Sequence, residues 1–175
     1  MGRPCSTQWL SLSAAVCCAL LIAAPRAVSA GTPESGGEVH EQHVPPIAFQ
    51  PASNGVGYVV EAGGLGRLCS TRAAGYFVAR LHLRDGVVIE RITVYLEDTN
   101  RDGLGMMSLA RRGPRSFEIL AMTPVSAETG DVEALSTTAI STPVVDNTQG
   151  AYLLQVVLTG PDVCLHDAQV TYRVP

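Results

Sequence analysis

An alternation of apolar and polar side chains with a period of two is the feature that most restricts how this chain can fold. The alternation is clearest over residues 76–84, where every second residue from Phe77 to Leu83 is apolar and the residues between them include Arg80 and His82. Successive side chains of a β-strand point to opposite faces, so this pattern predicts a strand with one buried face. No segment shows the period of a helix of useful length.

Similar runs recur along the chain and are separated by Gly, Pro, Asn and Asp. The turn residues Asp85 and Gly86 join residues 76–84 to residues 87–97, so these two runs are expected to form a hairpin. Residues 151–159 are apolar on both faces, which is typical of a central strand or an oligomer contact. The expected strands are 57–61, 76–84, 87–97, 104–111, 116–125, 132–140, 151–159 and 165–174. Short strands at this spacing predict an all-β domain, an antiparallel β-sandwich or jelly roll of about eight strands, with an open barrel as the alternative.

The first thirty residues have the composition of a secretory signal peptide. Arg3 precedes an apolar run at residues 10–24, and small residues at 28–30 precede Gly31. The apolar run is shorter than the roughly 20 residues that a membrane-spanning helix needs. We therefore expect cleavage after residue 30 rather than a retained anchor, a secreted or periplasmic location, and no membrane span in the mature chain.

Residues 31–46 are rich in Pro and Gly and contain only two larger aliphatic side chains, Val39 and Val44. Such a composition buries too little apolar surface to offset the entropy lost on ordering. It predicts a flexible leader at 31–46, followed by one β-sandwich domain at 47–175. His40 and His43, with Glu38, have the side chains of a transition-metal site, but a leader of this kind favours a solvated tail.

The charge of the chain argues against nucleic acid as a partner. The full sequence has a net charge of -4, and residues 31–175 retain ten arginines, no lysine and sixteen acidic residues, a net charge of -6. Binding of nucleic acid rests on cations that neutralise phosphates. Arg111, Arg112 and Arg115 are the only basic concentration, and we interpret them as a solvated strand end.

Removal of the signal peptide leaves Cys69 and Cys164 as the two cysteines of the mature chain. Export places them in an oxidising compartment, where such a pair normally forms a disulfide. The alternative, a redox or nucleophilic cysteine, lacks the C-x-x-C spacing. We therefore predict one disulfide whose two cysteines have a sequence separation of 95.

The loop that begins at Asp98 carries the most specific chemical motif. Asp98, Asn100, Asp102 and Gly103 fit D-x-[DN]-x-[DN]-G, the first half of a calcium-binding loop. A complete EF-hand has a bidentate Glu at the twelfth position, where this chain has Leu109. The sequence therefore favours a polar turn, with calcium bound by Asp98, Asn100 and Asp102 as the alternative. No other cofactor is predicted.

Most of the mature chain resembles a loosely defined group of secreted bacterial β-sandwich proteins that are uncharacterised. The resemblance rests on Leu81-His82-Leu83-Arg84-Asp85-Gly86, Ile92-Thr93-Val94-Tyr95-Leu96-Glu97-Asp98, Ser136-Thr137-Thr138-Ala139-Ile140, Val145-Asp146-Asn147 with Tyr152, and Val170-Thr171-Tyr172. It implies export and an all-β fold, and it assigns no catalytic residues.

The sequence itself assigns no catalytic residues either. The G-x-S-x-G elbow of serine hydrolases does not occur. The sequence therefore favours a secreted, non-catalytic binding or surface-associated module whose partner is an extracellular protein or a glycan. The alternative is a secreted hydrolase whose site is assembled from carboxylates on the sheets or loops.

Overall fold

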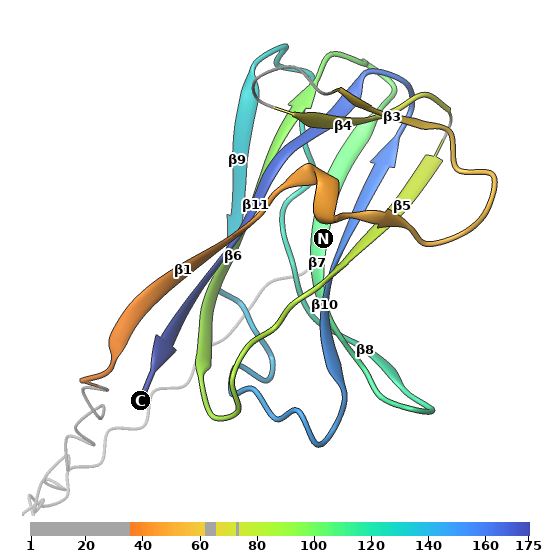
Figure 1. Cartoon of the computed structure of the whole chain (residues 1–175). Coiled ribbons are helices and arrows are strands. Elements are labelled where there is room, and N and C mark those ends of the chain that lie inside the picture. The colour runs from red at the N-terminus through yellow and green to blue at the C-terminus, as the bar shows by residue number, and fades with distance from the viewer. Residues whose placement is uncertain (1–35, 62–65, 73) are drawn as a thin grey trace, which may run out of the picture. The chain divides into compact units, whose positions relative to one another are not determined.

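The computed structural model describes residues 36–61, 66–72 and 74–175, and these residues form two antiparallel β-sheets (Figure 1). The predicted signal peptide at residues 1–30 lies outside the described residues. Among the described residues, no helix is long and apolar enough to cross a membrane.

One sheet has six strands and is built around the long strands β6 and β11. Its strands follow the order β3-β4-β11-β6-β9, and β1 pairs with the C-terminal part of β11. The strands are β1 (Glu38–Val44), β3 (Tyr58–Glu61), β4 (Arg67–Ser70), β6 (Val88–Asp98), β9 (Val132–Thr137) and β11 (Val163–Val174).

The second sheet has five strands in the order β2-β5-β10-β7-β8. Its strands are β2 (Gln50–Pro51), β5 (Ala74–Arg80), β7 (Leu104–Arg112), β8 (Phe117–Met122) and β10 (Ala151–Thr159), and a short 3-10 helix, η1 (Pro46–Ala48), precedes β2. β10 lies in the middle of this sheet, as its apolar composition predicted.

The core consists of the apolar side chains on the inner faces of the two sheets. Along β10, Tyr152, Leu154, Val156 and Leu158 are fully buried, while the residues between them are half-buried. The core residues with the largest side chains include Phe77, Leu68, Ile89, Ile92, Leu96, Met107, Leu109, Leu154 and Leu165. The fold class is therefore the predicted one, an all-β antiparallel sandwich.

The hairpin predicted from residues 76–84 and 87–97 was wrong. β5 pairs with β2 and β10 in one sheet, whereas β6 pairs with β11 and β9 in the other. The segment between them crosses from sheet to sheet, and its Leu81, Leu83 and Val87 side chains are buried. The alternation of apolar and polar residues shows which side chains are buried, but not which strands pair. A segment that crosses between sheets therefore has the same sequence pattern as a hairpin.

The flexible leader predicted at residues 31–46 was also wrong for the part that the structure describes. Glu38–Val44 forms β1, which pairs with β11 along seven consecutive register positions. Only Val44 is buried, so β1 is attached chiefly through backbone hydrogen bonds that leave no trace in composition. The ordered domain therefore begins earlier than residue 47.

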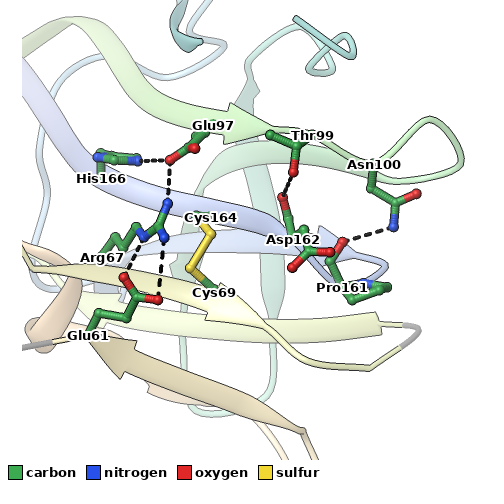
Figure 2. The surroundings of a disulfide bond; sticks show 10 residues. All are labelled: Glu61, Arg67, Cys69, Glu97, Thr99, Asn100, Pro161, Asp162, Cys164 and His166. Carbon is green, nitrogen blue, oxygen red and sulfur yellow. Dashed lines mark hydrogen bonds and ion pairs between the residues drawn. A yellow bond between two sulfur atoms is a disulfide. The ribbon is translucent and has the colours of Figure 1, made fainter. Parts of the chain in front are cut away.

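The predicted disulfide joins Cys69 of β4 to Cys164 of β11, and the two Cα atoms are 4.0 Å apart (Figure 2). β4 pairs with β11 at only two register positions, Cys164 with Cys69 and Leu165 with Leu68. β3 joins this sheet through β4. The disulfide therefore fastens the β3–β4 hairpin to the sandwich at a short junction.

We predict that replacing both cysteines by alanine lowers the free energy of unfolding by roughly 4 to 5 kcal/mol, because the bridge closes a loop of about 95 residues. Urea denaturation measures the loss. Hydrogen exchange should show the largest loss of protection in β3 and β4, because few other pairings hold them. An unchanged unfolding midpoint would contradict this role of the disulfide.

Candidate functional site

The outer face of the six-stranded sheet is occupied by interactions among its own polar side chains. Ion pairs and hydrogen bonds join strands of this sheet across this face. They are Arg67 with Glu61 and Glu97, His166 with Glu97, His43 with Asp167, Arg173 with Glu90, Thr93 with Ser136, and Tyr95 with Gln169. A partner that bound here would first have to break these contacts.

The densest of these contacts lie beside the disulfide, around a pocket of about 330 Å³ (Figure 2). The Arg67 guanidinium donates to Glu61 from Nε at 2.6 Å and to Glu97 from Nη1 at 2.7 Å. Nε2 of His166 lies 2.8 Å from the same Glu97 oxygen. The hydrogen bond with His166, and next the one with Arg67, lower the pKa of Glu97. Glu97 is thus held as a carboxylate, whereas a catalytic general acid needs a raised pKa.

We predict that Glu97→Gln destabilises the protein near neutral pH and has little effect in acid. A lowered pKa in the folded state stabilises the protein above the ordinary value of 4.5, and this stabilisation is lost as the pH falls through the lowered pKa. The measurement is the melting temperature of both proteins between neutral and acidic pH. Glu128→Gln, on an exposed loop, is the control and should leave the profile unchanged. A Glu97→Gln deficit that persists at low pH would contradict the assignment.

The outer face of the five-stranded sheet carries a larger group of exposed apolar side chains. Outward-pointing residues on its four longer strands are mostly apolar, and several are about half exposed: Tyr76 47%, Phe117 55%, Ile119 48% and Met122 47%. The register places Val157 between Tyr76 and Met106, and it places Ala110 between Leu153 and Ile119. We call this surface the apolar face, formed by Tyr76, Val78, Met106, Phe117, Ile119, Met122, Leu153 and Val157.

An open cleft of about 770 Å³ lies at one end of this face, where β5 ends and β10 begins. Arg80 pairs with Leu153, and Arg112 lies between Ala151 and Phe117, so the cleft continues directly from the apolar face. The cleft is lined by Arg80, Leu81, His82, Leu83, Arg84, Arg112, Gly113, Pro114, Asn147, Thr148, Gly150, Ala151 and Tyr152. None of these lining residues is acidic.

Hydrogen bonds hold the two loops that form the cleft walls. The backbone N–H of Asn147 donates to Asp85 at 2.6 Å, and its side-chain amide donates to the carbonyl of Leu83 at 3.0 Å. Asp146 accepts from the hydroxyl and backbone N–H of Thr148 and from Gln149, and these hydrogen bonds lower the pKa of Asp146. The cleft is therefore preorganised, which reduces the entropy lost when a ligand binds.

In the Asp98 loop, hydrogen bonds within the protein occupy groups that would bind calcium in the alternative interpretation. Asp98 is buried and accepts from the Ser126 hydroxyl at 2.6 Å and from the Asn100 backbone N–H at 3.1 Å. The side-chain oxygen of Asn100 accepts from the Asp102 backbone N–H. The side-chain amide of Asn100 donates to the Pro161 carbonyl at 2.8 Å (Figure 2). This is a polar turn of the predicted kind. Whether calcium binds there stays a prediction.

We predict that millimolar calcium leaves the melting temperature unchanged. The two oxygens of Asp98 already accept hydrogen bonds, and a calcium ion needs six to eight oxygen ligands. Thermal melts with calcium and with chelator measure the effect. A large upward shift that Asp102→Ala abolishes would show that the loop binds calcium.

The two histidines of β1 do not meet. Residues three apart on a strand point to opposite faces. His40 accordingly stacks on Tyr172, with ring centroids 5.6 Å apart, whereas Nδ1 of His43 lies 2.6 Å from Asp167. Glu38 lies 3.6 Å from His40. Among the described residues, no group of three or more His, Cys, Asp or Glu side chains is arranged to hold a metal ion.

The cleft and its arginines were not predicted from the sequence. Arg111, Arg112 and Arg115 were interpreted as one solvated strand end, but Arg111 bonds Glu118 at 2.6 Å while Arg112 lines the cleft. The hydrogen bond with Glu118 raises the pKa of Arg111. Arg80, Arg84 and Arg112 line the same cleft. They come together because β5 and β7, which are separate in the sequence, both pair with β10. Strand order was not predictable from the sequence, so neither was this cluster.

No protein-family model and no curated protein sequence matches the chain. Solved structures do match. The C-terminal CBM6 of LamC, a marine laminarinase from Zobellia galactanivorans, is 11% identical with a TM-score of 0.53, over 75% of this chain and 99% of that one. An arabinoxylan arabinofuranohydrolase of glycoside hydrolase family 43 from Bacillus subtilis, in complex with cellotetraose, is 12% identical with a TM-score of 0.53, over 74% of this chain and 26% of that one.

A third match is the CBM22-1-GH10 portion of xylanase Xyn10B from Clostridium thermocellum, complexed with xylohexaose. It is 14% identical with a TM-score of 0.50, over 75% of this chain and 28% of that one. The chain thus spans nearly all of the LamC module but only about a quarter of each of the other two proteins. At these identities the likeness shows the fold alone: this chain has the β-sandwich fold of CBM6-type structures.

Proposed function

We propose that this protein is a secreted, non-catalytic module that binds a glycan along the apolar face and the adjoining cleft. The observation that carries the proposal is the difference between the two outer faces. On the six-stranded sheet, ion pairs and hydrogen bonds join the strands across the outer face, and exposed apolar residues such as Val59 and Val132 lie on separate strands, β3 and β9. The five-stranded sheet exposes a larger group of apolar side chains that leads into an open cleft. Exposed apolar surface with a polar rim marks interaction sites.

The chemistry of this surface suits a sugar polymer. A sugar ring has apolar C–H faces that pack on aromatic and aliphatic side chains, and hydroxyl edges that need hydrogen-bond partners. Tyr76 and Phe117 supply exposed rings on the apolar face. Asn147, Thr148 and the arginines of the cleft supply polar groups beside them.

The matched structures support the proposal by their fold. The LamC match is a carbohydrate-binding module, and the xylanase match is complexed with xylohexaose. The apolar run at residues 10–24 and the disulfide support export to a secreted or periplasmic location.

The alternative of a secreted hydrolase receives no support from the described carboxylates. The cleft lining contains none of them. Glu61 and Glu97 lie near each other, but both bond Arg67, and the pKa of Glu97 is lowered. A glycosidase pair needs one carboxyl group with a raised pKa.

We predict that the mature protein is retarded in affinity electrophoresis by at least one of laminarin, xylan and polygalacturonate. Tyr76→Ala and Ile119→Ala should each weaken the binding about tenfold, because both remove exposed contact area from the apolar face. Both side chains are half exposed, so the variants should fold normally, and circular dichroism checks this.

Val132→Ala is the matched control. Val132 is 50% exposed but belongs to β9 of the other sheet, so this variant should bind as the wild type does. An equal loss in Val132→Ala would exclude the apolar face as the specific site. Failure of all three polysaccharides to retard the protein would overturn the proposed function.

A further inference from the structure

Three arginines of the cleft have no partner within the described part of the chain. Arg80, Arg84 and Arg112 line the cleft, and all three side chains belong to exposed residues. No hydrogen bond or ion pair joins any of them to another described residue. Arg67, Arg91, Arg111 and Arg173 show the contrast, because each of these pairs with a glutamate.

The positive charge of these three guanidinium groups contrasts with the negative net charge of the protein. Residues 31–175 carry sixteen acidic residues and ten arginines, yet the cleft lining contains three arginines and no acidic residue. The nearest carboxylates along the chain hold the cleft walls, since Asp85 accepts from Asn147, and Asp146 accepts from Thr148 and Gln149. Within the described part of the chain, neither carboxylate forms an ion pair with the three arginines. The cleft is therefore a local positive site on an acidic protein.

We propose that the cleft binds the anionic groups of an acidic glycan, the carboxylates of uronic acids or sulfate esters, through Arg80, Arg84 and Arg112. This inference rests on the proposed function and names its ligand class. A guanidinium presents a planar set of donors that matches the oxygens of carboxylate and sulfate groups, and hydrogen bonds between charged groups are stronger than neutral ones.

The apolar face favours an acidic sugar polymer over other polyanions. Sugar rings that pack on Leu153 and Phe117 bring their substituents to Arg80 and Arg112, which are the direct cross-strand neighbours of these two residues. Nucleic acid binds mainly through many phosphate contacts, which three arginines do not supply when residues 31–175 carry a net charge of -6. Binding must therefore combine short-range charge contacts with apolar contacts.

The test compares matched acidic and neutral polymers by isothermal titration calorimetry on the mature protein. The probes are polygalacturonate and its methyl ester, dextran sulfate and dextran, and polyglutamate as a polyanion without sugar. We expect an acidic glycan to bind at least tenfold more tightly than its neutral counterpart, and this preference to shrink with added salt. Preference for polygalacturonate identifies carboxylate as the bound group, and preference for dextran sulfate identifies sulfate.

Arg80→Gln, Arg84→Gln and Arg112→Gln should each weaken binding of the preferred acidic polymer roughly tenfold. Arg101→Gln is the control, because Arg101 is also exposed and without a described partner but lies in the loop at the other end of β6. Equal losses in Arg101→Gln would overturn the inference.

Two further outcomes separate this inference from the proposed function. If the neutral polymers bind as tightly as the acidic ones and the arginine variants bind normally, the inference fails while glycan binding stands. If polyglutamate binds as tightly as the acidic glycans, the cleft is a general anion site and the inference also fails. If no polymer binds, both proposals fail.

Discussion

The structure depends on the burial of two apolar sheet faces against each other. Each long strand contributes every second side chain to this core, as β10 does with Tyr152, Leu154, Val156 and Leu158. Burial of these side chains fixes the register of the strands, because a shift by one residue would turn the core side chains toward solvent. The outward side chains are then free to differ between the sheets.

The two outer faces use this freedom in opposite ways. On the six-stranded sheet, contacts such as those of His43 with Asp167 and of Arg173 with Glu90 join strands that are far apart in the sequence. On the five-stranded sheet, Tyr76 and Ile119 remain half exposed, and Arg80 remains without a described partner. Surface side chains that are not used to stabilise the fold are available to bind a ligand, so the proposed function and its acidic ligand follow from one asymmetry.

Local sequence patterns predicted the strands but not which strands pair with each other. The alternation of apolar and polar residues located most of the strands and the buried side chains of β5 and β6. The disulfide of Cys69 and Cys164 was predicted because an exported chain would retain only these two cysteines. The β5–β6 hairpin was wrong because pairing depends on the whole sandwich. β1 was missed because an edge strand is held by backbone hydrogen bonds. The cleft was not predicted because its arginines come from strands whose order in the sheet cannot be read from local sequence. The wrong hairpin prediction has the same cause.

The central claim is that one outer face binds a ligand and the other stabilises the fold. Chemical-shift mapping by NMR during a titration with an acidic oligosaccharide tests it most directly. The account predicts that the perturbed amides cluster on β5, β7, β8, β10 and the loops at 81–87 and 144–150, while β6, β9 and β11 stay unchanged. Perturbations centred on the outer face of the six-stranded sheet, around Arg67, Glu97 and His166, would contradict it.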